Sequence, residues 1–87
     1  IILLNNHGYS SIGGLSQSLG SMGFGTHYTY RSPKTGKVEG ERLPVDLAAN
    51  AESLGAQVLR IQSYEELQNA LKKAKSSEQT TVIYAET

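Results

Sequence analysis

The chain has 87 residues, eight basic and eight acidic side chains, and no cysteine, which suits one small domain without disulfides or thiolate zinc sites. Its zero formal charge gives no electrostatic reason to expect nucleic acid or a membrane as a partner. The longest aliphatic run, residues 1–4, is far shorter than the roughly 20 residues of a membrane span, so we expect a soluble protein of the cytoplasm.

The first predicted element is a β-strand over residues 1–6. Its consecutive aliphatic side chains, Ile1 to Leu4, are typical of a strand that is covered on both faces in a parallel sheet, so we expect a central strand. Because the chain begins inside this run, we expect a fragment that starts within a domain, with further strands of the sheet before Ile1.

The next predicted element is a helix that begins after Asp46, whose carboxylate can accept hydrogen bonds from the first amide groups. Gly55 stands where a helix commonly ends in a left-handed conformation. Apolar residues recur at helical spacing between these positions, at Leu47, Ala51 and Leu54. A strand over residues 56–61 follows.

A second helix is predicted from Ser63, which stands in capping-box spacing with Glu66. Leucines and alanines fall on one of its faces, and lysines lie near its end, where they favour the helix dipole. These residues are Leu67, Ala70, Leu71 and Ala74, followed by Lys72, Lys73 and Lys75. The last strand is predicted over residues 81–85, and we interpret Tyr64 and Tyr84 as ordinary packing residues.

Strand, helix, strand, helix and strand in this order predict an α/β fold: a parallel sheet with flanking helices in three layers. Three strands and two long helices are too few to cover both faces of such a sheet, which again indicates part of a larger domain. A compact domain that stands alone is the alternative.

Residues 13–45 are predicted to form a long Gly-rich loop region. Eight of the nine glycines lie between residue 7 and Asp46, and connections this long are usually functional or disordered. Within it, we interpret residues 31–42 as a surface turn. Residues 5–19 differ, because their polar groups follow the carboxyl end of a strand, where open α/β sheets place ligands.

Asn5 and Asn6 supply neutral oxygen ligands, and Gly8 permits a backbone twist that can aim a carbonyl group at a cation. Residues 10–12 can open a helix whose amide groups point at an anion. Together these residues predict a hard cation beside a phosphate group. Asn-Asn followed by Gly is also an ordinary turn, so a non-catalytic α/β interaction module is the second hypothesis.

The strand that ends in Asn5-Asn6 and leads to Gly8-Tyr9 resembles the closing half of the thiamine diphosphate fingerprint. The opening half, Gly-Asp-Gly, would lie before Ile1. The stretch PVDLAANAESLGAQVLRIQSYEELQNALKKAKSSEQTTVIYAET resembles the continuation of the diphosphate-binding domain of thiamine-diphosphate-dependent enzymes. The resemblance thus implies that residues 1–87 are the C-terminal part of that domain.

Residues 11–46 are similar to one branch of this family, the trihydroxycyclohexane-1,2-dione hydrolases of myo-inositol catabolism. The resemblance implies an enzyme that requires thiamine diphosphate and Mg²⁺ and hydrolyses a C–C bond of a cyclic polyhydroxylated dione. The chain alone would be inactive. A 2-keto acid decarboxylase or carboligase, such as acetolactate synthase, is the alternative, because the diphosphate loop is common to the family.

The resemblance implies that the Asn6 side chain and the Gly8 carbonyl group bind the Mg²⁺ that bridges the cofactor's diphosphate, while Asn5 braces the turn. The diphosphate would lie along Tyr9, Ser10, Ser11 and Ile12. No catalytic residue is implied within the chain, because the activating glutamate comes from another domain, usually of a neighbouring subunit. The expected partners are therefore the rest of the chain, a second subunit of a homo-oligomer and the small-molecule dione.

Two histidines invite a catalytic interpretation, because histidine titrates near neutral pH. We expect His7 to point toward a substrate cavity or a subunit contact. His27 belongs to a run with Tyr28, Tyr30 and Arg31, which we interpret as part of a subunit interface, where tyrosine and arginine are enriched. Contact with a polyhydroxylated ring is the alternative for this run.

Overall fold

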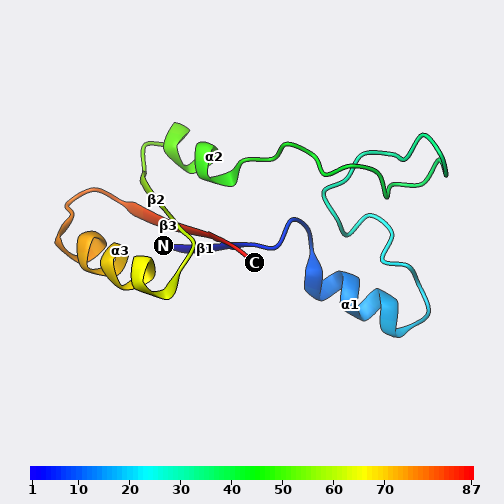
Figure 1. The fold of residues 1–87 in the computed structure, drawn as a ribbon, viewed down its shortest axis with the longest axis horizontal. Helices are drawn as coiled ribbons and strands as arrows, with labels where there is room; N and C mark the ends of the chain where they lie inside the picture. The colour runs from blue at the N-terminus through cyan, green and yellow to red at the C-terminus, as the bar shows by residue number, and fades with distance from the viewer. The chain divides into compact units, whose positions relative to one another are not determined.

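The computed structural model describes residues 1–87, which form two compact units. The first unit contains residues 1–5 and 46–87, and the second contains residues 6–45. The elements are β1 (Ile2–Asn5), α1 (Ser10–Ser18), α2 (Leu47–Ser53), β2 (Gln57–Ile61), α3 (Tyr64–Ser76) and β3 (Thr81–Glu86) (Figure 1). The predicted α/β fold is confirmed. None of the three helices has the length and hydrophobicity of a membrane-spanning segment.

The first unit is built on a parallel sheet with the strand order β1-β3-β2. Ile83 of β3 lies opposite Ile2 of β1 and Leu59 of β2, so β3 is the central strand. The prediction that residues 1–6 form a central strand is therefore wrong for the sheet of these residues. β1 pairs on one side only, and Ile2 and Leu4 are 55% and 65% exposed.

The sheet has a helix on each face, as predicted (Figure 1). Because side chains alternate along a strand, the register places Arg60 and Tyr84 on one face and Ile61 and Ile83 on the other. On the first face, the Arg60 guanidinium contacts Asp46, the residue that precedes α2. On the second face, Ile61 and Leu67 of α3 line one hollow.

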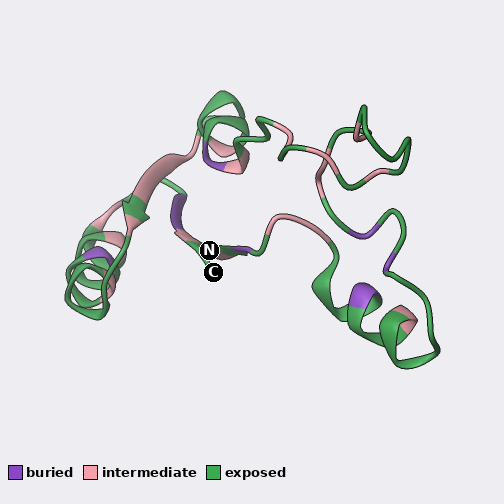
Figure 2. Ribbon diagram, turned by 45° about the vertical axis from the view of Figure 1, so that its right-hand side comes forward, coloured by how far each residue is buried: buried purple, intermediate pink, exposed green.

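The buried part of the first unit is small and centres on β3, where residues 81–84 are buried (Figure 2). Each helix of this unit contributes one buried residue, Ala48 from α2 and Ala70 from α3. Small side chains at these positions let both helices lie close to the strands. Tyr64 is 74% exposed, so its interpretation as a packing residue is wrong.

Asp46 caps α2 as predicted, since its Oδ1 atom accepts a hydrogen bond from the Ala49 amide group at 3.0 Å. Both carboxylate oxygens of Asp46 also accept hydrogen bonds from Arg60 Nη2, at 3.0 and 2.9 Å. The Ala49 amide group, followed by the Arg60 guanidinium, lowers the pKa of the Asp46 carboxyl below 3.8. Gly55, with a φ of +96°, takes the predicted left-handed conformation after the helix.

The lowered pKa of Asp46 gives an expected pH dependence. A carboxyl whose pKa is lower in the folded chain stabilises the fold above its unfolded value, 3.8, and this contribution is lost as the pH falls through the folded pKa. Asp46→Asn keeps a capping oxygen but has no charge. In urea unfolding, the stability difference between the chain and this variant should shrink as the pH is lowered below 3.8. A difference in unfolding free energy that does not change with pH would contradict the lowered pKa of Asp46.

Ser63 caps α3, as its Oγ atom accepts a hydrogen bond from the Glu66 amide group at 3.1 Å. The Glu66 carboxylate reaches back to the Gln62 amide group at 2.5 Å, one residue before the expected partner of a capping box. Ser63→Ala should lower the free energy of unfolding by about 1 kcal/mol in urea titrations. Ser76→Ala, at the other end of α3, is the control, with a change within about 0.5 kcal/mol.

The second unit contains α1 and an irregular chain held by antiparallel bridges, Gly8 with His27 and Thr29 with Arg42. α1 extends through Ser18, so the first six residues of the predicted loop region, 13–18, are helical. A turn forms in the stretch interpreted as a surface turn, where the Gly36 amide group donates to the Ser32 carbonyl group at 2.9 Å.

Candidate functional site

The residues predicted to bind metal and diphosphate, Asn6 and residues 8–12, all belong to the second unit. Two backbone hydrogen bonds join their segment to residues 26–28. The Tyr9 amide group donates to the Thr26 carbonyl group at 2.7 Å, and the Tyr28 amide group donates to the His7 carbonyl group at 2.9 Å. The structure therefore brings the predicted loop together with a second segment.

Gly8 lies opposite His27 between these two bonds, so the pair is of the antiparallel type that exchanges no hydrogen bond of its own. In such a pair the carbonyl group points away from the partner strand. The Gly8 carbonyl oxygen is therefore left to accept from, or coordinate, a group outside the bridge.

Glycine is required at position 8 because the two segments approach closely. A Cβ atom there would stand 2.2 Å from the Thr26 carbonyl oxygen. The expected role of Gly8, a backbone twist, needs a correction, since the positive φ of 59° occurs at His7. Such a conformation costs a non-glycine residue about 1–3 kcal/mol, and histidine is among the residue types that adopt it more often than others.

α1 begins beside this carbonyl group without a side-chain cap. Tyr9 holds the N-cap position but makes no capping bond, and the first turn carries no acidic residue. The first amide groups of a helix have no acceptor within it, and they carry the positive end of its dipole. Ser10, Ser11 and Ile12 are exposed, and a helix start of this kind can bind an anion such as a phosphate.

Thr26 organises the second unit and was missed in the sequence. It is 6% exposed, and its Oγ1 atom donates to the Gly23 carbonyl group at 2.6 Å. A Cβ atom on Gly13 of α1 would lie 2.8 Å from the same Oγ1 atom, so α1 packs directly on Thr26. The conformation of the loop therefore depends on Thr26, and the only sequence signal was the number of glycines around it.

The two asparagines have different surroundings. Asn5 is 3% exposed, and its side-chain amide donates to the Tyr84 hydroxyl group at 2.8 Å. Asn6 is exposed. The Asn6 amide oxygen and the Gly8 carbonyl oxygen are thus the neutral oxygens that this loop offers to a hard cation. The chain has no group of three or more His, Cys, Asp or Glu residues that could hold a metal ion.

His27 lines a cavity of about 460 Å³ within the second unit. Apolar and polar side chains share its walls: Met22, Phe24 and Val38 with Thr29, Lys37 and Glu39. The other members of the His27 run lie outside the set that lines it. Tyr28 packs edge-on against Tyr9 with ring centroids 5.7 Å apart, and Arg31 donates to the Gly36 carbonyl group.

Comparison with known proteins identifies the family that the sequence resembles. The family described as "Thiamine pyrophosphate enzyme, C-terminal TPP binding domain" matches residues 1–85. No solved structure gives a significant match.

Three curated relatives are named as trihydroxycyclohexane-1,2-dione hydrolases. A protein of Bacillus cereus is 37% identical over 95% of this chain, and proteins of Bacillus thuringiensis and Clostridium botulinum are each 35% identical over the same share. The chain spans 13% of the length of each of these proteins. The chain belongs to the thiamine pyrophosphate enzymes and matches their C-terminal cofactor-binding domain.

Proposed function

We propose that this chain holds the Mg²⁺-bound diphosphate of thiamine diphosphate in a longer enzyme that hydrolyses a C–C bond of a cyclic polyhydroxylated dione. One observation carries the proposal: the unpaired Gly8 carbonyl group directly precedes the uncapped start of α1. In this proposal, a cation ligand and an anion site therefore lie next to each other within residues 8–12. The names of the related proteins support the choice of substrate.

In this proposal, the Asn6 side-chain oxygen and the Gly8 carbonyl oxygen bind Mg²⁺. Mg²⁺ requires six oxygens, so the remaining ligands come from the diphosphate, water and an acidic residue outside this loop. The amide groups at the start of α1, at Ser10, Ser11 and Ile12, donate to the diphosphate beside Tyr9. When bound, thiamine diphosphate supplies the electron sink for cleavage of the C–C bond.

No side chain of this chain is proposed to transfer a proton to or from the substrate. The activating glutamate comes from another domain, in a second subunit of a homo-oligomer, so the 87 residues alone are inactive. The enzyme works in the cytoplasm on a small molecule, and neither nucleic acid nor a membrane takes part.

Turnover by the full-length enzyme tests the proposed reaction. With thiamine diphosphate and Mg²⁺ it should open the cyclic dione, and a chelator should abolish this activity. Pyruvate is the comparison substrate. Turnover of pyruvate and not of the dione would contradict the hydrolase assignment and favour the decarboxylase and carboligase branch.

Calorimetry of the isolated chain tests whether the cofactor site is shared with other parts of the enzyme. We expect no Mg²⁺-dependent binding of thiamine diphosphate, because this loop supplies only two of the six metal ligands. Tight binding to the isolated chain would contradict a shared site.

A further inference from the structure

The cavity of about 460 Å³ in the second unit is bordered by three segments of the chain. His27 and Thr29 form one wall, residues 22–24 form a second, and residues 37–39 form a third. Its volume lies within the roughly 300–1,000 Å³ of pockets that bind small molecules. The cavity is therefore large enough for a small cyclic molecule.

Hydrogen bonds hold the second and third walls to the segment that forms the first. Thr26 donates to the Gly23 carbonyl group from its amide group and from its Oγ1 atom, at 3.1 and 2.6 Å. The Thr29 Oγ1 atom donates to the Val38 carbonyl group at 3.0 Å. The cavity is thus maintained by bonds between residues of the second unit.

Three polar side chains at the cavity have no hydrogen-bond or ion-pair partner in the chain: His27, Lys37 and Glu39. A neutral histidine both donates and accepts, a lysine only donates, and a carboxylate only accepts. The charges of Lys37 and Glu39 cancel, so the cavity favours a neutral ligand that carries both donors and acceptors. A polyhydroxylated dione is such a ligand.

The apolar part of the lining suits the carbon skeleton of the same ligand. Met22 and Phe24 are 72% and 79% exposed, so most of their surface is available for contact. The C–H groups on the face of a polyhydroxylated ring can pack on an aromatic ring, whose face is electron-rich. The cavity therefore combines apolar contact with a few polar groups, as pockets for small molecules do.

The cavity adjoins the loop that we propose to hold Mg²⁺. His27 lies opposite Gly8 in the antiparallel bridge, and a Cβ atom on Gly8 would be 3.0 Å from the His27 Cα atom. Both residues belong to the second unit. The thiazolium ring of the cofactor is joined to its diphosphate by an ethyl group, so the substrate has to bind near the residues that hold the diphosphate.

We propose that this cavity binds the cyclic polyhydroxylated dione. His27 and Lys37 donate to its oxygen atoms, and Glu39 accepts from its hydroxyl groups. The negative charge of Glu39 disfavours a 2-keto acid, whose carboxylate it repels. The three side chains bind the substrate and transfer no proton. This inference rests on the proposed function, because that function supplies the identity of the substrate.

Lys37→Ala and Glu39→Ala in the full-length enzyme test the inference. Each substitution removes a charged hydrogen-bonding group, so KM for the dione should rise about 10–100-fold. The kcat value and the calorimetric affinity for thiamine diphosphate with Mg²⁺ should stay close to those of the wild type, because only uniform binding of the substrate is lost. Lys34→Ala and Glu41→Ala are the matched controls. Their exposed side chains lie outside the cavity, so KM should not change.

A wild-type KM in both cavity variants would overturn the inference. If one variant loses cofactor binding, the KM of the other decides. Loss of cofactor binding in both would also overturn the inference, because it would give Lys37 and Glu39 a structural role.

The same assays separate this inference from the proposed function. If the wild type opens the dione and both cavity variants keep its KM, the cavity is not the substrate site and the proposed function stands. If the wild type turns over pyruvate and not the dione, both fail.

Discussion

Asn6→Ala should abolish Mg²⁺-dependent binding of thiamine diphosphate by the full-length enzyme. The substitution removes the exposed amide oxygen that we propose as a metal ligand. The loss should exceed the about 10–100-fold effect of removing an outer partner of a metal ligand, since a ligand itself is lost. Calorimetric titration of the cofactor, with and without Mg²⁺, measures the change.

Asn6→Asp and Asn50→Ala complete this experiment. Asp keeps an oxygen at the same position, and carboxylates bind Mg²⁺, so Asn6→Asp should retain metal-dependent binding. Asn50 lies exposed on α2 in the first unit, so Asn50→Ala should leave binding unchanged. Normal cofactor affinity in Asn6→Ala would remove Asn6 from the metal site.

Gly8→Ala should also abolish cofactor binding, for a steric reason. Its Cβ atom would stand 2.2 Å from the Thr26 carbonyl oxygen, so the two segments would have to separate and the Tyr9 to Thr26 hydrogen bond would lengthen or break. The Gly8 carbonyl group would then lose its position beside α1. We expect a destabilisation of about 1–3 kcal/mol in urea unfolding of the chain.

Gly14→Ala is the matched control for Gly8→Ala. Gly14 lies inside α1 and a Cβ atom there would meet no atom within 4 Å. Alanine favours a helix interior over glycine by about 1 kcal/mol, so this variant should be as stable as the wild type or more stable. If Gly8→Ala were equally stable and bound the cofactor normally, the close approach to Thr26 would not matter for the site.

The parts of the fold that could be predicted from sequence depend on short-range interactions. Asp46 and Ser63 each bond an amide group three residues later, so their caps follow from spacing alone. The place of β1 in the sheet could not be predicted in this way. Aliphatic residues at 1–4 indicate a strand suited to a covered position, and they do not say which segment covers it.

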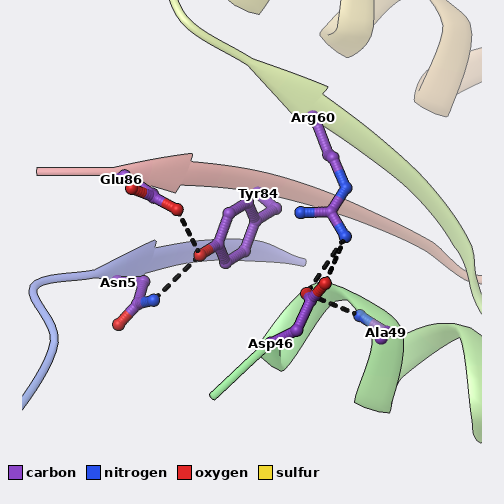
Figure 3. A network of polar contacts seen from close by, with 6 residues as sticks. All are labelled: Asn5, Asp46, Ala49, Arg60, Tyr84 and Glu86. Atoms are coloured by element: carbon purple, nitrogen blue, oxygen red, sulfur yellow. Dashed lines mark hydrogen bonds and ion pairs between the residues drawn. The ribbon is translucent and has the colours of Figure 1, made fainter. Parts of the chain in front are cut away.

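The parts of the site that were missed depend on pairs of residues far apart in the sequence. Tyr84 is buried, as expected of a packing residue, but the bond from Asn5, 79 positions away, to its hydroxyl group was not predicted (Figure 3). The role of Thr26 in holding the loop follows from the pairing of residues 8 and 27, which the sequence did not indicate. The resemblance supplied the ligand assignment, and the structure added the reason why position 8 requires glycine.

A crystal structure of the full-length enzyme with thiamine diphosphate and Mg²⁺ tests the central claim most directly. We predict the Asn6 side-chain oxygen and the Gly8 carbonyl oxygen at about 2.0–2.1 Å from the metal, with the diphosphate at the start of α1. A metal site that includes neither oxygen would contradict the account.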